Sequence, residues 1–176
     1  MSKSALEFYL CPAWYPIKNS KLAPRGAKNS ELMMNGILHA HSGLRWVVLI
    51  LLIASTFMAL LKWRSNAPYT DGGRKLNLFT MISMHVQLLL GLALYFMSGR
   101  VDFSQMKDAM YRFFTVEHTT MMLLAIVLVT IGHSKSKKTA DEVKKHKVIF
   151  LFYGIALLLV LLGIPWPFRG FGNGWF

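Results

Sequence analysis

The chain has 176 residues, of which 54% are hydrophobic, and it carries a formal net charge of +12 and one cysteine. A single cysteine excludes an internal disulfide, a four-cysteine zinc site and an iron–sulfur cluster held by this chain alone. The positive charge does not indicate nucleic-acid binding, because it lies mainly in loops beside long apolar runs, as in membrane proteins.

The first 36 residues are polar and contain Pro12, Pro16 and Pro24. They lack the apolar segment and the small-residue cleavage site of a signal peptide. We expect residues 1–36 to be a tail that is disordered or loosely bound to the membrane surface. Alternatively, translation begins at Met33 or Met34, directly before the first apolar run, and residues 1–32 are absent from the native protein.

Four apolar runs follow, at about residues 43–62, 76–98, 113–132 and 147–164. Each is close to the roughly 20 residues with which a helix crosses about 30 Å of hydrocarbon. The sequence therefore predicts an all-α fold, an integral membrane four-helix up-down bundle over residues 37–169, followed by a glycine- and aromatic-rich tail at 170–176. The fourth run has nothing ionisable between Val148 and Ile164, so we expect it to pack at the periphery or to seal the bundle.

The loops after the first and third runs hold most of the cations that flank the membrane, and short cytoplasmic loops are rich in lysine and arginine. This distribution predicts a multi-pass protein of the cell inner membrane with both termini external. The ten cations of these two loops are Lys62, Arg64, Arg74, Lys75, Lys135, Lys137, Lys138, Lys144, Lys145 and Lys147, and the opposite side has only Arg100, Lys107, Arg112 and Arg169 outside the tail.

Ionisable side chains inside an apolar run are costly and are usually paired or functional. Glu117 and His118 open the third run, and His85 lies near the middle of the second. In the first run, His41 and Arg45 are one turn apart on a polar and small-residue face that should look into the bundle.

Three other histidines are expected to have no role in a site. At about 100° per residue, His39 is turned to the far side of the first span from His41. His133 and His146 lie at the cytoplasmic edge of the runs, where we expect solvated loop residues.

Histidines at these positions favour haem binding. The first and third spans of an up-down bundle are diagonal neighbours, and two inward imidazoles there can hold a flat haem from both faces. His41 and His118 fit this requirement in helical phase, although their expected heights differ by up to about 10 Å at 1.5 Å per residue. His85 is the substitute ligand. Arg45 is expected either to face a haem propionate or to form a structural ion pair with Glu117.

Four motifs, HAHSGLRW (39–46), MHVQLLLG (84–91), RFFTVEH (112–118) and IPWPF (164–168), resemble a family of small bacterial four-span proteins labelled cytochrome b-like. The likeness covers about residues 34–169. More distantly, the histidines of the first and third spans resemble each four-helix half of the haem A synthases. The resemblance implies a b-type haem held by His41 and His118 in an inner membrane. The doubling of the haem A synthases is absent here, so synthase activity would require a dimer.

The sequence thus favours a haem b protein that passes electrons to or from a quinone pool or a larger respiratory complex, an electron-transfer subunit rather than a stand-alone enzyme. Its expected partners are the lipid bilayer, a quinone or another membrane subunit, with a second copy of the chain left open and no nucleic acid. One alternative is a haem-free structural or assembly subunit. A weaker one is a proton or small-solute pathway through His85, Gln87 and Glu117.

Overall fold

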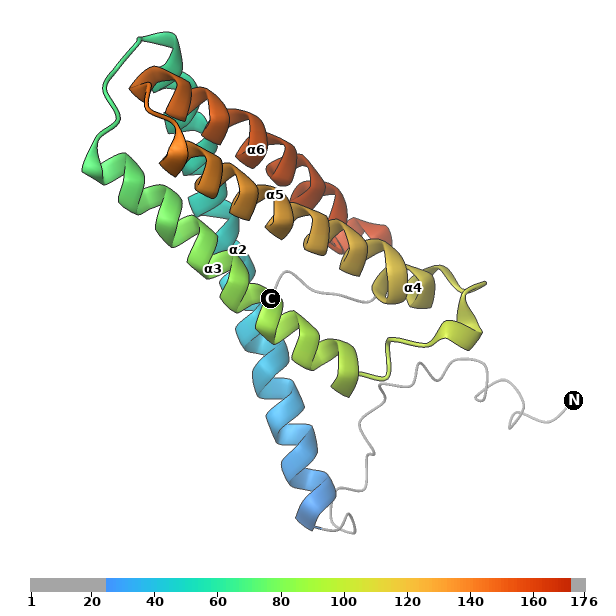
Figure 1. Ribbon diagram of the computed structural model, residues 1–176. Coiled ribbons are helices and arrows are strands. Elements are labelled where there is room, and N and C mark those ends of the chain that lie inside the picture. Colours follow the sequence, from blue (N-terminus) through green and yellow to red (C-terminus); the bar gives the residue numbers. More distant parts are fainter. Residues whose placement is uncertain (1–24, 172–176) are drawn as a thin grey trace, which may run out of the picture.

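In the computed structural model, which describes residues 25–171, the chain forms four long helical spans and no strand among those residues (Figure 1). The first two spans are α2 (Arg25–Arg64) and α3 (Asp71–Met97), and the fourth is α6 (Glu142–Gly163). The third joins α4 (Ala109–Arg112), a π-helix η2 (Phe113–Glu117) and α5 (His118–Lys138). Two short 3-10 turns, η1 (Phe103–Gln105) and η3 (Pro167–Arg169), lie outside the spans. All four spans are long and apolar enough to cross a membrane, so this is a multi-pass membrane protein.

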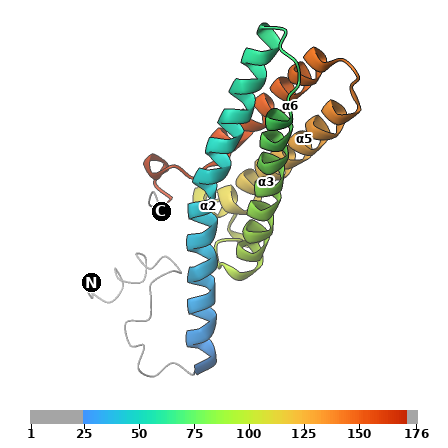
Figure 2. The ribbon, with the colours of Figure 1, turned by 90° about the vertical axis from the view of Figure 1, so that its left-hand side faces the viewer.

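The spans form a ring, with α2 and α5 each packed against both α3 and α6 (Figure 2). Successive spans run in opposite directions, and the first and third are diagonal neighbours (Figure 1). This arrangement confirms the predicted all-α up-down four-helix bundle. We name its two ends by their loops: the lysine-rich end carries residues 65–70 and 139–141, and the cavity end carries residues 98–108 and 164–171.

The first span begins earlier than the sequence predicted. α2 starts at Arg25, so the part of the expected tail from residue 25 to 36 is helical. No proline interrupts the chain between Arg25 and Ala67, and the stretch around Glu31-Leu32-Met33 consists of good helix formers. At 1.5 Å per residue, α2 is about 60 Å long and α6 about 33 Å, and α2 projects beyond the other spans (Figure 2). The rest of the tail and residues 172–176 lie outside the described residues.

The fourth span packs against two neighbours, so of its two expected positions, at the periphery or sealing the bundle, the structure agrees with the second. α6 packs against both α2 and α5, and Ile149, Tyr153 and Ala156 on it are completely buried. The Tyr153 hydroxyl, an ionisable group that the sequence reading overlooked, donates a hydrogen bond to the Asn77 carbonyl of α3 at 2.9 Å. Since this bond crosses the bundle diagonally, α6 contributes polar as well as apolar contacts to the core.

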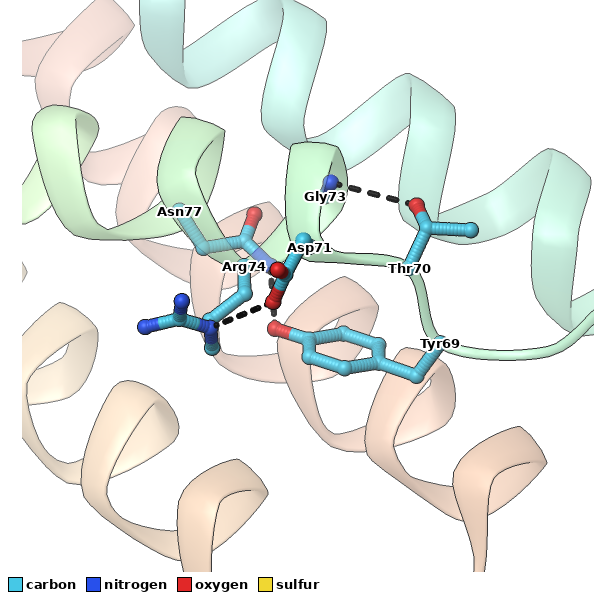
Figure 3. A network of polar contacts seen from close by, with 6 residues as sticks. All are labelled: Tyr69, Thr70, Asp71, Gly73, Arg74 and Asn77. Carbon is cyan, nitrogen blue, oxygen red and sulfur yellow. Dashed lines mark hydrogen bonds and ion pairs between the residues drawn. The ribbon is translucent and has the colours of Figure 1, made fainter.

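At the lysine-rich end, polar contacts join the segment that leads into α3 to the first turns of that helix (Figure 3). Thr70 caps this helix by accepting a hydrogen bond from the Gly73 amide at 3.3 Å, and Asn77 Nδ2 donates to the Tyr69 hydroxyl at 2.9 Å. The imidazole of His146 packs against the Tyr69 ring at 5.0 Å and is only 2% exposed. His146 is therefore a buried packing residue, and the expectation that it is solvated is wrong, because this segment folds back over it.

His133 is not a loop residue either. α5 continues to Lys138, which leaves His133 half-buried on the last turns of the helix. Its Nδ1 is buried and makes no hydrogen bond with any described residue. The helix outlasts the apolar run because lysines are good helix formers and stabilise a helix C-terminus.

Candidate functional site

A cavity of about 370 Å³ lies at the cavity end of the bundle, between α2, α3 and the third span. Its walls are mostly apolar, and its volume falls in the roughly 300–1,000 Å³ range of small-molecule sites. His41, Arg45 and His118 all line it. The structure thus brings three of the four predicted cofactor-binding residues to one place, despite the height difference expected between the two histidines.

The π-helix η2 sets the orientation of His118. A π-helix bonds i to i+5 and so adds a residue to the turn, which changes the direction in which later side chains point. Directly after it, His118 faces α6, and its Nδ1 lies 2.7 Å from the Gly163 carbonyl oxygen. Only a protonated Nδ1 can donate to a carbonyl, so Nε2 is left as an acceptor, and it forms no hydrogen bond within the described part of the chain. This is the hydrogen-bonding pattern of histidines that ligate metals.

His41 lies directly against the backbone of α3. A Cβ atom placed on Gly91 would be 3.2 Å from His41 Cε1, closer than ordinary van der Waals contact, so only glycine leaves the imidazole its full room. Gln87 Nε2 donates to the His41 carbonyl at 2.9 Å and ties the two helices together at this level. His41 Nδ1 and Gln87 Oε1 are both buried and have no hydrogen-bond partner among residues 25–171. Unsatisfied buried polar atoms of this kind mark a site that another molecule can complete.

Arg45 lies one turn along α2 from His41. Its guanidinium is 5.3 Å from the centre of the Trp46 ring, a cation–π distance. It lines the same cavity as both imidazoles. The cavity therefore combines two ring nitrogens with one nearby positive charge.

The predicted ion pair between Arg45 and Glu117 is wrong. The Glu117 carboxylate accepts a hydrogen bond from Arg112 Nε at 2.9 Å, and both side chains are nearly half exposed. Because Glu117 and His118 are adjacent on one helix, they point in different directions, and turning His118 inward sends Glu117 outward. Glu117 is thus a surface residue paired within its own span.

Two other predicted histidine positions also differ. His85 Nδ1 lies 2.8 Å from the Met81 carbonyl of its own helix, and Nε2 is 3.5 Å from Thr130 Oγ1 on α5. His85 is not among the residues that line the cavity, so it does not meet His41 or His118 there. His39, expected on the far side of α2, instead is among the residues that line the cavity, although it is exposed.

The donor set of the cavity suits haem better than a bare metal ion. Over the described range, no three His, Cys, Asp or Glu side chains gather in a group that could hold a metal ion. Two imidazoles from diagonal helices are the set required by a metal that brings its own equatorial ligands, as haem iron does. Gly91, which lies against the His41 ring, and the apolar walls also fit a flat, largely apolar molecule.

The sequence did not indicate two backbone features of this site. The Gly163 carbonyl that contacts His118 could not be predicted, because every residue type has a main-chain carbonyl. Gly91 could have been noticed as a glycine inside an apolar run, where close helix approach is common.

No protein-family model, curated protein or solved structure matches the chain.

Proposed function

We propose that this protein binds a b-type haem in the cavity and passes electrons between a quinone pool, or a larger respiratory complex, and that haem. The observation that supports the proposal is the meeting of His41 and His118, from diagonal helices, in one apolar cavity. The Nδ1–H of His118 is already engaged by a carbonyl, which leaves Nε2 for an iron. The resemblance of the four sequence motifs to cytochrome b-like proteins implies a b-type haem as well.

The residues around the cavity have separate roles in this proposal. His118 and His41 would hold the haem, Gly91 lets the His41 ring lie against α3, and Gln87 holds the α2 backbone at that level. Haem, when bound, supplies reversible one-electron chemistry. The apolar walls would exclude water from the bound haem.

The charge of Arg45 adds an argument for haem. A positive charge near both imidazoles repels a metal cation placed between them, and this repulsion is strong where the dielectric constant is low. A porphyrin brings negative charge with the iron and offsets that repulsion. Arg45 lines the same cavity, so it would belong to the site that holds the cofactor.

We further propose that the membrane is the cell inner membrane and that the lysine-rich end faces the cytoplasm, with both termini external. Ten cations on the ends of the helices that flank the two loops of that end support this orientation. Reporter fusions after Ser65 and Lys138 should then behave as cytoplasmic, and fusions after Gln105 and Phe176 as external. A cytoplasmic carboxyl terminus would contradict the orientation.

The deciding experiment is an optical spectrum of detergent-purified protein supplemented with haem. Two imidazole ligands give a low-spin haem, so dithionite reduction should produce sharp α and Soret bands, and acidified solvent should extract the haem, because the motif that attaches haem covalently is absent. His118→Ala and His41→Ala should each abolish these bands. His85→Ala is the matched control, since His85 lies outside the cavity, and its spectrum should be that of the wild type.

The alternative is a haem-free structural or assembly subunit. It is favoured by hydrogen bonds that join the helices without any ligand, such as the buried pair Ser55 Oγ and Thr80 Oγ1 at 2.7 Å. A folded, haem-supplemented preparation without Soret absorbance would support this alternative and reject the cytochrome proposal.

A further inference from the structure

His41 has one ring nitrogen that the fold leaves without a partner. Nδ1 of His118 lies 2.7 Å from a backbone carbonyl oxygen, and Nδ1 of His85 lies 2.8 Å from another. The Nδ1 atom of His41 is buried and has no hydrogen-bond partner among residues 25–171. A buried polar atom without a partner is costly, so the His41 ring is stabilised by any group that can bond to this nitrogen.

Gln87 carries a complementary atom. Its Nε2 donates a hydrogen bond to the His41 carbonyl oxygen at 2.9 Å. A carbonyl only accepts, so this bond fixes which end of the amide is the NH₂ group and leaves Oε1 as an acceptor. Oε1 is also buried, and it too has no partner within the described part of the chain. An acceptor on Gln87 and a ring nitrogen on His41 are therefore both unsatisfied at one level of the interface between α2 and α3.

The edge of the His41 ring that carries Nδ1 faces the helix of Gln87. A Cβ atom on Gly91 would lie 3.2 Å from His41 Cε1 and 3.7 Å from Nδ1. Gln87 lies one turn before Gly91 on the same face of α3. Because the Gln87 amide also bonds to the main chain of His41, the amide and the imidazole are neighbours. A rotation of the ring or the amide that joins Oε1 to Nδ1 breaks no existing hydrogen bond of these two atoms.

We propose that Gln87 is a positioning residue for His41: its Oε1 accepts a hydrogen bond from Nδ1–H and holds the imidazole in the tautomer whose Nε2 can bind a ligand in the cavity. The hydrogen bond made by one ring nitrogen decides which nitrogen is left for a ligand. Gln87 thus does for His41 what the Gly163 carbonyl does for His118. This inference rests on the proposed function in that it concerns the same histidine and cavity, but its test needs no haem.

The test measures the tautomer of His41 by nuclear magnetic resonance. The full chain, containing isotope-labelled histidine and expressed under haem limitation, is studied in detergent at mildly alkaline pH, where imidazoles are neutral. Nitrogen chemical shifts distinguish Nδ1–H from Nε2–H, and the His41→Asn variant identifies the signals of His41. The wild type should carry the His41 proton mainly on Nδ1, as His118 does.

Two variants separate positioning from packing. Gln87→Met keeps the length of the side chain and removes the acceptor, so the ratio of Nδ1–H to Nε2–H in His41 should fall about fivefold, which corresponds to one ordinary hydrogen bond. If Gln87→Met fails to fold, Gln87→Ala, with the best helix former, takes its place. Thr80→Val is the matched control, because it removes the buried hydrogen bond between Ser55 Oγ and Thr80 Oγ1, which also joins α2 to α3. This control should lose stability without changing the His41 tautomer.

The outcomes separate this inference from the proposed function. A wild-type His41 that carries its proton on Nε2 would overturn the inference, and so would a tautomer ratio that the Gln87 variant changes no more than Thr80→Val does. An Nδ1–H tautomer that depends on Gln87, without any histidine-dependent haem spectrum, would uphold the inference and reject haem. A haem spectrum that requires His41, with a tautomer that does not depend on Gln87, would do the reverse.

Discussion

Substitution of Gly132 by alanine tests how closely α5 and α6 pack. A Cβ atom at this position would lie 2.5 Å from Phe152 Cβ and 3.1 Å from Phe152 Cγ, whereas carbon atoms in contact are about 3.5–4.0 Å apart. Phe152 Cβ is attached to the backbone and cannot move alone, so the two helices must separate by about 1 Å. Overpacking of this size costs about 1–3 kcal/mol. Gly132→Ala should therefore lower the free energy of unfolding.

The matched control is Gly154→Ala on α6. There the nearest atom to an added Cβ is Thr56 Cγ2 at 3.7 Å, an ordinary contact. Both variants gain up to about 1 kcal/mol from the better helix propensity of alanine, so the difference between them isolates the overpacking cost of about 1–3 kcal/mol.

Unfolding in mixed micelles of dodecyl maltoside and SDS, followed by far-ultraviolet circular dichroism, measures that difference. Gly132 is 14 positions from His118, or about 21 Å along the helix, so the haem spectrum of the folded fraction should be unchanged. Equal stability of the two variants would refute the reasoning, because the helices would then not approach as closely as the structure has them.

Two further predictions concern the cavity and the lysine-rich end. Gly91→Ala should push the His41 ring by a few tenths of an ångström from its position and lower haem affinity about tenfold. Gly43→Ala is the control, because its added Cβ meets nothing within 4 Å, and it should leave haem affinity unchanged. Titration with haem measures both affinities, and equal values would exclude a role for Gly91 in the site. The Asp141 carboxylate caps α6 by accepting a hydrogen bond from the Lys144 amide at 3.0 Å, and this bond lowers the pKa of Asp141. The stabilising effect of the cap is therefore present above the ordinary pKa of about 3.9 and is lost as the pH falls through the lowered pKa. Melting temperatures measured against pH should therefore show the wild type losing stability in that acidic window relative to Asp141→Asn, whose amide caps without titrating; parallel curves would contradict the assignment.

The sequence by itself determined the class, the number of spans and the up-down order. Each apolar run is long enough to cross a bilayer, and backbone groups in hydrocarbon must be satisfied within the helix, so runs of this length have few other structures open to them. Helical phase predicted that His41 and His118 face the same interior, because 3.6 residues per turn relates positions within one regular helix reliably.

Relations between helices were decided only by the tertiary structure. The π-helix before His118 changed the phase of the third span, and the partner of Glu117 became Arg112 instead of Arg45. Whether His85 reaches the cavity, or how deeply His146 is buried, depends on the rotation and height of neighbouring spans. Hydropathy does not encode the rotation and height of a span, because lipid and a neighbouring apolar helix are equivalent surroundings for an apolar side chain. The choice among possible arrangements depends on close packing at residues such as Gly91 and on hydrogen bonds to backbone carbonyls.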